Sequence, residues 1–155
     1  MDLILWRHAD AEEGEDDLAR NLTHKGHRQA KRMARWLHAY LPRHVTVLCS
    51  PANRARQTAD ALHLPYQVTD AIAPDCNVTK LYETAGWPSA DSDSAVILVG
   101  HNPAISDLAS RILAARTFPM SQRKGSVLWL TSRTREGEPG VVIKAAMVPS
   151  MLKHG

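Results

Sequence analysis

Two arginines and two histidines of this sequence stand just after short apolar runs. They are Arg7, His8, Arg54 and His101. Runs of this length that end in polar residues are typical of buried strands in a parallel sheet; they cover 3–6, 45–49 and 95–99. Because ligands of open α/β sheets bind beyond the carboxyl ends of the strands, we expect the four side chains to meet at one edge of a sheet. Such a set suits an anionic phosphoryl group.

Histidine and arginine together can support phosphoryl transfer without a metal ion. A neutral imidazole can attack phosphorus and form a covalent phosphohistidine, which water then hydrolyses, and we assign this nucleophile to His8. The planar guanidinium groups of Arg7 and Arg54 match phosphate oxygens in bidentate fashion. Arg54 also falls in the first turn of a predicted helix, where free N–H groups favour anions. We expect His101 to donate a hydrogen bond to an equatorial phosphate oxygen.

Each of these residues also has a purely structural interpretation. A single histidine is more often a satisfied core residue than a nucleophile, and it is the position of His8 beside Arg7 that favours catalysis. His101 could instead cap a helix, and most arginines form surface ion pairs. Arg56 follows Arg54 by two residues on the predicted helix, faces another direction, and is left out of the site.

The order of predicted strands and helices indicates a three-layer α/β fold in one domain, residues 1–155, with a mostly parallel central sheet and an antiparallel edge. Ser50 and Asn102 are each followed by a proline, and a capping residue before a proline at the first helical position predicts a strand-to-helix junction. A helix capped by Thr23 is expected to run to Tyr40. The other predicted helices cover 51–62, 78–85 and 103–115.

The remaining elements are a short strand and a hairpin. The strand is predicted at 64–68, and the segments 126–131 and 141–148 are predicted to pair at the sheet edge through the turn cluster 136–140. Gly26 lies in the first turn of a predicted helix, where it indicates either close backbone packing or a tolerated weak position.

Several short motifs make the sequence similar to a known family. Three motifs resemble those of the histidine phosphatase superfamily. They are Arg7-His8-Ala9, 50–58 (Ser-Pro-Ala-Asn-Arg-Ala-Arg-Gln-Thr) and 100–103 (Gly-His-Asn-Pro). The short length and the segment 20–26 (Arg-Asn-Leu-Thr-His-Lys-Gly) resemble its small bacterial branch, the SixA-type phosphohistidine phosphatases. The resemblance implies a phosphoglycerate mutase-like fold, no metal or cofactor, and a phosphohistidine intermediate on His8. It also implies a phosphate-binding role for Arg20, whose alternative is a solvent-exposed loop arginine.

The sequence departs from the family pattern at the general acid. Many members carry an acidic residue after the third strand, whereas this chain offers only Asp75 and Glu83, neither of them a clean match. A well-placed acid contributes about 10²–10⁴-fold, so its absence penalises alkoxide leaving groups. Phosphohistidine that is protonated on its other nitrogen departs as neutral imidazole, whose conjugate acid has a pKa of about 6.5. The expected substrate is therefore phosphohistidine on a protein, such as a histidine phosphotransfer domain or a phosphocarrier.

The composition is typical of a soluble globular protein. The 155 residues are 44% hydrophobic and 23% charged, and no apolar run approaches the length of a membrane span. Because the chain enters a strand within three residues, no signal peptide is expected, and we expect a cytoplasmic monomer that binds neither membrane nor nucleic acid. Cys49 and Cys76 have no metal-like spacing and are expected to be reduced thiols.

The net charge of +3 is unevenly distributed. An acidic loop is formed by Glu12, Glu13, Glu15, Asp16 and Asp17. A basic stretch without acidic residues follows, formed by Lys25, Arg28, Lys31, Arg32, Arg35 and Arg43. The ordinary interpretation of both is a solvated surface, although a basic face could also bind an acidic protein partner or nucleic acid.

Three alternatives remain open at this point. A phosphatase of the same fold could act on a small phosphoester with a loop carboxylate as acid. A non-catalytic module could use the basic helix for binding, and His8→Ala would then leave its biological effect intact. A metallohydrolase built on His8, Asp10 and His101 is disfavoured because Arg7 and Arg54 would repel a divalent cation.

Overall fold

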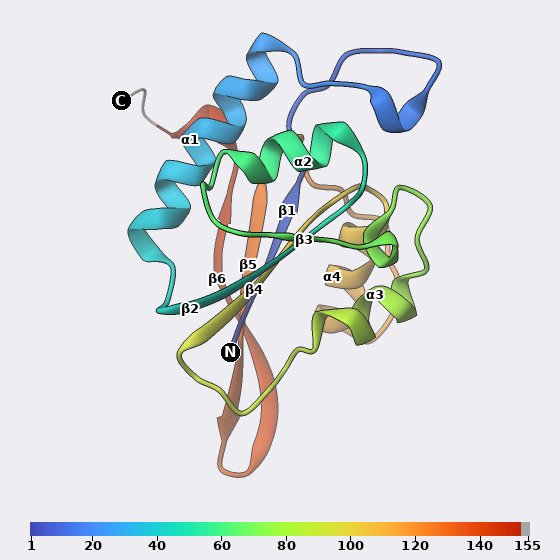
Figure 1. The fold of residues 1–155 in the computed structure, drawn as a ribbon. Helices are drawn as coiled ribbons and strands as arrows, with labels where there is room; N and C mark the ends of the chain where they lie inside the picture. The colour runs from blue at the N-terminus through green and yellow to red at the C-terminus, as the bar shows by residue number, and fades with distance from the viewer. Residues whose placement is uncertain (153–155) are drawn as a thin grey trace.

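Six strands form one mixed sheet in the computed structural model, which describes residues 1–152 (Figure 1). The strands are β1 (Asp2–Arg7), β2 (His44–Cys49), β3 (Gln67–Val68), β4 (Ser94–Gly100), β5 (Val127–Arg135) and β6 (Glu138–Met147). Their order in the sheet is β3-β2-β4-β1-β5-β6. The strands β3, β2, β4 and β1 run parallel to one another. In contrast, β5 pairs antiparallel with β1, and β6 pairs antiparallel with β5. The predicted mostly parallel sheet with an antiparallel edge is confirmed.

Helices cover both faces of the sheet and complete the three layers (Figure 1). They are α1 (His24–Tyr40), α2 (Asn53–Asp60), α3 (Val78–Ala85) and α4 (Ala104–Ala114), with the short 3-10 helices η1 (Asp17–Ala19), η2 (Asp70–Ile72) and η3 (Pro149–Met151). Successive side chains of a strand point to opposite faces. Accordingly Leu3 and Leu5 of β1 pack with α3 and α4, while Ile4 and Trp6 pack with α1 and α2. No helix within residues 1–152 is both long and apolar enough to cross a membrane.

The parallel strands place their carboxyl ends at one edge of the sheet. Arg7 at the end of β1 lies opposite Gly100 at the end of β4, and Cys49 of β2 lies opposite Val99. The turn between β5 and β6 lies at the opposite end of the molecule (Figure 1). The residues that follow β1, β2 and β4 therefore share one end of the fold.

The predicted starts of two helices are wrong in detail, although both strand-to-helix junctions are confirmed. The helix α2 begins at Asn53 after Ala52, and α4 begins at Ala104 after Pro103, so neither proline occupies the first helical position. Ser50 and Asn102 do not cap these helices, because their side chains are engaged in the junctions themselves. Ser50 Oγ accepts from Ala52 N, and Asn102 Nδ2 donates to the Gln122 carbonyl.

The two predicted edge elements also differ from the sequence expectation. Only Gln67 and Val68 of the segment 64–68 are paired with β2. The hairpin turn is shorter than the cluster 136–140, since only Glu136 (φ 54°) and Gly137 (φ 81°) lie between the strands. Positive φ at both central residues matches the twist of paired strands, so the two-residue turn is favoured. Pro139 is consequently part of β6, an edge strand, where its missing N–H is tolerated.

Close packing explains the glycine in the first turn of α1. A Cβ at Gly26 would overlap the carbonyl oxygen of Asp10. Thr23 caps the helix as predicted, with its Oγ1 accepting from Gly26 N at 3.0 Å, and it donates to Asp10 Oδ2 at 2.7 Å. The start of α1 is thus held directly against the loop that follows β1.

Candidate active site

The structure brings the four predicted side chains together at the carboxyl edge. Arg7 and His8 leave β1, Arg54 is the second residue of α2, and His101 is the first residue after β4. The rings of His8 and His101 have centroids 5.1 Å apart. Three of the four are almost completely buried, at 7% exposure for His8, 4% for Arg54 and 3% for His101. The buried charge of Arg54 needs either a paired partner or an anion.

One ring nitrogen of His8 is unprotonated and has a free lone pair. Its Nδ1 lies 2.7 Å from the Ala9 carbonyl oxygen, and a carbonyl can only accept, so Nδ1 carries the proton. Nε2 of the neutral ring is then unprotonated. Burial lowers the pKa of His8 to about 4; the Ala9 hydrogen bond opposes this effect, and the charges of Arg54 and Arg7 add to it. At neutral pH the ring is a neutral base with an available lone pair.

Hydrogen bonds from two other elements hold His8 in place. Its backbone N donates to the Gly100 carbonyl at 2.9 Å. Ala9 N donates to Thr58 Oγ1 at 3.0 Å, and Thr58 Oγ1 donates to the Arg54 carbonyl at 2.7 Å. The segment after β1 is thus tied to both β4 and α2, and one hydroxyl connects the backbones of Ala9 and Arg54.

His101 is oriented by a serine at the end of β2. Its Nε2 lies 2.7 Å from Ser50 Oγ, which also accepts from Ala52 N at 3.2 Å. We assign the Ser50 proton to the bond with Nε2, which leaves the proton of neutral His101 on Nδ1. Nδ1 is buried and has no hydrogen-bond partner within residues 1–152. Burial lowers the pKa of His101 to about 3, with His8 and Arg54 adding to the effect, so Nδ1 is a neutral donor.

The two site arginines keep donors free for an anion. Arg7 Nη1 donates to the Gln122 carbonyl at 2.7 Å. The Nε atoms of Arg7 and Arg54 are buried and have no partner in the described part of the chain. Gln122 is itself held by a bond from its Nε2 to the Leu5 carbonyl at 3.1 Å. The Arg7 fork is therefore fixed by a loop that the sequence did not connect with the site.

A carboxylate that the sequence analysis did not select also reaches the site. Asp17 Oδ2 accepts from Arg54 Nη2 at 3.1 Å, its carbonyl accepts from Arg54 Nη1 at 2.6 Å, and its Oδ1 accepts from Arg20 Nη1 at 3.1 Å. Partial desolvation alone would raise the pKa of Asp17, which stays about half exposed, but its hydrogen bonds with Arg54 and Arg20 outweigh this and lower it. Arg20 thus joins the group through Asp17. The spacing of three residues between Asp17 and Arg20 was the only sequence signal for the contact between them.

The two acids considered from the sequence lie elsewhere. Asp75 and Glu83 are exposed, and Glu83 lies on α3. Neither forms a hydrogen bond or salt bridge with the four site residues within residues 1–152. The same part of the chain holds no group of three or more histidine, cysteine or acidic side chains arranged for a metal ion.

Comparison with known proteins identifies the family. Residues 3–73 match the model of the histidine phosphatase superfamily (branch 1). The chain is 30% identical over 129 residues to the phosphohistidine phosphatase SixA of Escherichia coli K12, covering 77% of this chain and 79% of SixA. The chain belongs to the histidine phosphatase superfamily. This histidine phosphatase is also 30% identical over 141 residues to an uncharacterised protein of Picosynechococcus, covering 85% of this chain and 86% of that protein.

The fold of this histidine phosphatase agrees with solved structures. The structure of the protein histidine phosphatase SixA complexed with tungstate superimposes with a TM-score of 0.77, at 24% identity, over 99% of this chain and 100% of that one. The predicted phosphoglycerate mutase-like α/β fold and the SixA-type resemblance are thereby confirmed. The site described above lies in a phosphatase fold.

Proposed function

We propose that this histidine phosphatase hydrolyses phosphohistidine on a protein through a covalent intermediate at His8. The observation that carries the proposal is the hydrogen bond from His8 Nδ1 to Ala9, because it directs the lone pair of a buried neutral ring to Nε2. Arg7, Arg20, Arg54 and His101 would bind the phosphoryl oxygens. The name of the Escherichia coli relative, a phosphohistidine phosphatase, supports the substrate class.

The first step transfers the phosphoryl group to the enzyme. His8 Nε2 forms a bond to phosphorus while the P–N bond of the substrate breaks, and the electron pair of that bond stays on the departing nitrogen. Since the substrate ring is protonated at its other nitrogen, it leaves as neutral imidazole and needs no proton from the enzyme. The arginines and the His101 Nδ1–H stabilise the charge spread over the three equatorial oxygens.

The second step restores the free enzyme. Water attacks phosphorus, the P–Nε2 bond breaks, and its electron pair returns to Nε2 of His8. The proton lost by water passes to the phosphate product or to solvent. Throughout both steps Nδ1 keeps its proton and donates it in a hydrogen bond to the Ala9 carbonyl. This bond holds the ring in the tautomer that the next cycle requires.

The charge state of Asp17 favours a substrate whose leaving group needs no general acid. Partial desolvation would raise its pKa, but hydrogen bonds with Arg54 and Arg20 outweigh this and lower it, so the carboxylate is ionised at neutral pH and has no proton to give. Its carboxylate oxygens also take two of the N–H groups that phosphoryl oxygens would use. An incoming phosphoryl group therefore has to displace this carboxylate.

The proposal extends to partners and setting. We propose one catalytic domain, residues 1–155, acting as a monomer in the cytoplasm, without metal or cofactor. Its partner would be a phosphorylated protein of the phosphotransfer-domain or phosphocarrier type. A small phosphorylated substrate is the competing candidate in the same site.

The experiment compares two peptides of one sequence, one carrying phosphohistidine and the other phosphoserine. Without an acid for the leaving group, we expect phosphate release from phosphohistidine to be faster by about 10²-fold or more, after subtraction of the enzyme-free rate. Equal or faster release from phosphoserine would favour the alternative hypothesis, in which the substrate is a small phosphoester. Release from neither, with a binding effect that survives His8→Ala, would favour the non-catalytic module.

A further inference from the structure

A second basic hollow lies beside Arg7. It has a volume of about 380 Å³ and is walled by the start of α1, the loop before β5 and the segment that leads into η3. Four cationic side chains line it, namely Arg7, Lys25, Arg123 and Lys124. Because Arg7 also belongs to the candidate active site, a ligand held here would lie next to a phosphoryl group bound at His8.

The loop that carries two of these cations is fastened to the end of β1. Gly125 N donates to the carbonyls of Arg7 and His8, at 3.1 and 2.9 Å, and Trp6 Nε1 donates to the Gly125 carbonyl at 3.1 Å. Gly125 has a φ of +75°, and a Cβ there would lie 3.0 Å from Pro149. Backbone hydrogen bonds and close packing thus give Arg123 and Lys124 a fixed attachment.

The hollow has more positive charge than its single lining acid can neutralise. Asp10 is already engaged, by Lys124 at 3.2 Å and by the Thr23 hydroxyl at 2.7 Å. Lys25 and Arg123 are exposed, and neither forms a salt bridge with another residue in the range 1–152. Two cations therefore face the hollow without a direct carboxylate partner.

We propose that this hollow binds a carboxylate of the protein substrate, from an acidic side chain close in sequence to the phosphorylated residue. The inference rests on the proposed function, since it assumes that the phosphoryl group lies at His8. An extended chain advances about 3.3 Å per residue, so a glutamate one or two residues away is within reach of the adjacent hollow. Lys25 and Arg123 would determine the preference, while Arg7 serves the phosphoryl group.

The test uses a double variant, Lys25→Gln with Arg123→Gln, and three substrates. These are phosphoramidate and two phosphohistidine peptides that differ only by glutamate or glutamine beside the phosphorylated residue. For the wild type we expect a KM about threefold to tenfold lower for the glutamate peptide. In the double variant this advantage disappears, while hydrolysis of phosphoramidate stays within about twofold, which also shows that the variant is folded.

A matched control removes the same charge elsewhere. Lys80→Gln with Arg135→Gln takes two exposed cations from α3 and from the hairpin end, and it should keep the glutamate advantage. An equal loss in this control, or no difference between the peptides in the wild type, overturns the inference. If the wild type releases phosphate from none of the substrates, the proposed function itself fails; release from phosphoramidate without a peptide preference removes the carboxylate site alone.

Discussion

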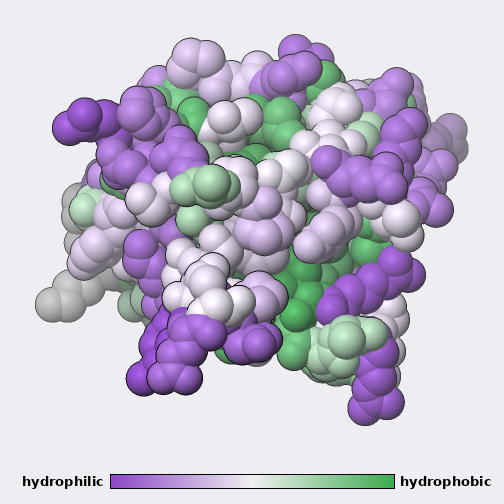
Figure 2. Space-filling model, turned by 90° about the horizontal axis from the view of Figure 1, so that it is seen from below, coloured by the Kyte–Doolittle hydropathy of each residue, from purple (hydrophilic) through white to green (hydrophobic). Residues whose placement is uncertain are grey.

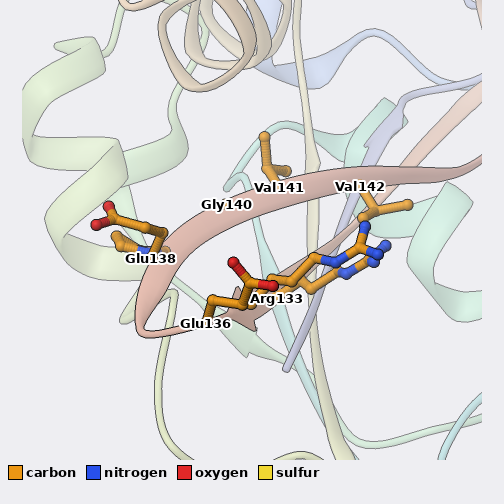
Figure 3. A pocket seen from close by; sticks show the side chains of 8 residues that line it. Arg133, Glu136, Glu138, Gly140, Val141 and Val142 are labelled. Carbon is orange, nitrogen blue, oxygen red and sulfur yellow. The ribbon is translucent and has the colours of Figure 1, made fainter.

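The two ends of the sheet carry the same kinds of charged residue in opposite environments. At the carboxyl end, Arg54 is 4% exposed and is bound to Asp17. At the hairpin end, Arg133, Glu136 and Glu138 line an open hollow of about 570 Å³, where Figure 3 shows the Arg133 guanidinium directed toward Val142 and the Glu138 carboxylate directed away from it. Figure 2 shows this end covered largely by hydrophilic side chains, with apolar surface in strips between them.

Burial, and not residue type, distinguishes the candidate active site from the hollow at the hairpin end. Exposed charges are stabilised by water and interact weakly with one another. Buried charges shift each other's protonation, as Arg54 and Arg7 do when they add to the burial that lowers the pKa of His8 to about 4. An anion therefore gains far more at the carboxyl end than at the hairpin.

Removing one arginine from each end gives the largest contrast. Arg54→Gln should lower kcat/KM for phosphoramidate by about 10²–10³-fold, because it removes a fixed donor to the transferring group. Arg135→Gln at the hairpin end should leave kcat/KM within about twofold. Steady-state phosphate release by the two variants makes the comparison, and equal losses would remove the distinction between the two ends.

The pH profile tests the buried charge state of His8. Since its pKa is lowered to about 4, kcat/KM should not change through His8 between pH 8 and pH 5, and it should fall below about pH 4 as Nε2 takes up a proton. The same lowered pKa makes the fold lose stability as the pH falls from about 6.5 through 4, because the unfolded chain binds the proton more readily. Circular dichroism over this range separates the two effects. A decline centred near pH 6.5 would show that His8 is not desolvated.

The Thr58 hydroxyl allows a smaller, matched test of positioning. Thr58→Val removes the link between Ala9 N and the Arg54 carbonyl, so we expect kcat to fall about tenfold with a smaller change in KM. Thr84 makes the same bond to a carbonyl four residues earlier, that of Lys80, but on α3 and away from the site. Thr84→Val should leave kcat unchanged. A similar loss of kcat in both variants would point to a general effect of helix stability.

The smallest expected effect concerns the carboxylate that occupies the arginines. Asp17→Asn weakens the contacts with Arg54 and Arg20, so inorganic phosphate should bind about twofold to tenfold more tightly as a competitive inhibitor. Asp16→Asn changes the same charge one residue away and should not alter the inhibition constant. Weaker phosphate binding in Asp17→Asn would show that Asp17 positions the arginines and does not compete with the anion.

Much of the site follows from sequence because parallel strands end at a common edge. Apolar runs locate β1, β2 and β4, and this alone places Arg7, His8, Arg54 and His101 together. Arg20 was found only through the family motif, since nothing in a polar loop indicates where its side chain lies. The fold class was predictable for the same reason as the site, because alternating strands and helices restrict the topology.

The rest depends on contacts that no local pattern encodes. Asp17 reaches Arg54 across 37 positions, and Gln122 holds Arg7 across 115. The proton on His8 Nδ1 depends on the Ala9 carbonyl, and the peptide group that contains this carbonyl is held by the bond from Asp10 N to Gln29 Oε1. The two-residue hairpin turn depends on backbone angles at Glu136 and Gly137, although the sequence offered a longer cluster of turn residues.

The central claim is that His8 becomes phosphorylated, and intact-protein mass spectrometry tests it most directly. Wild type and His8→Ala are incubated briefly with phosphoramidate and quenched without acid, since phosphohistidine is acid-labile. The account predicts one phosphoryl adduct on the wild type and none on His8→Ala. An adduct on both proteins, or phosphate release by His8→Ala at the wild-type rate, would contradict it.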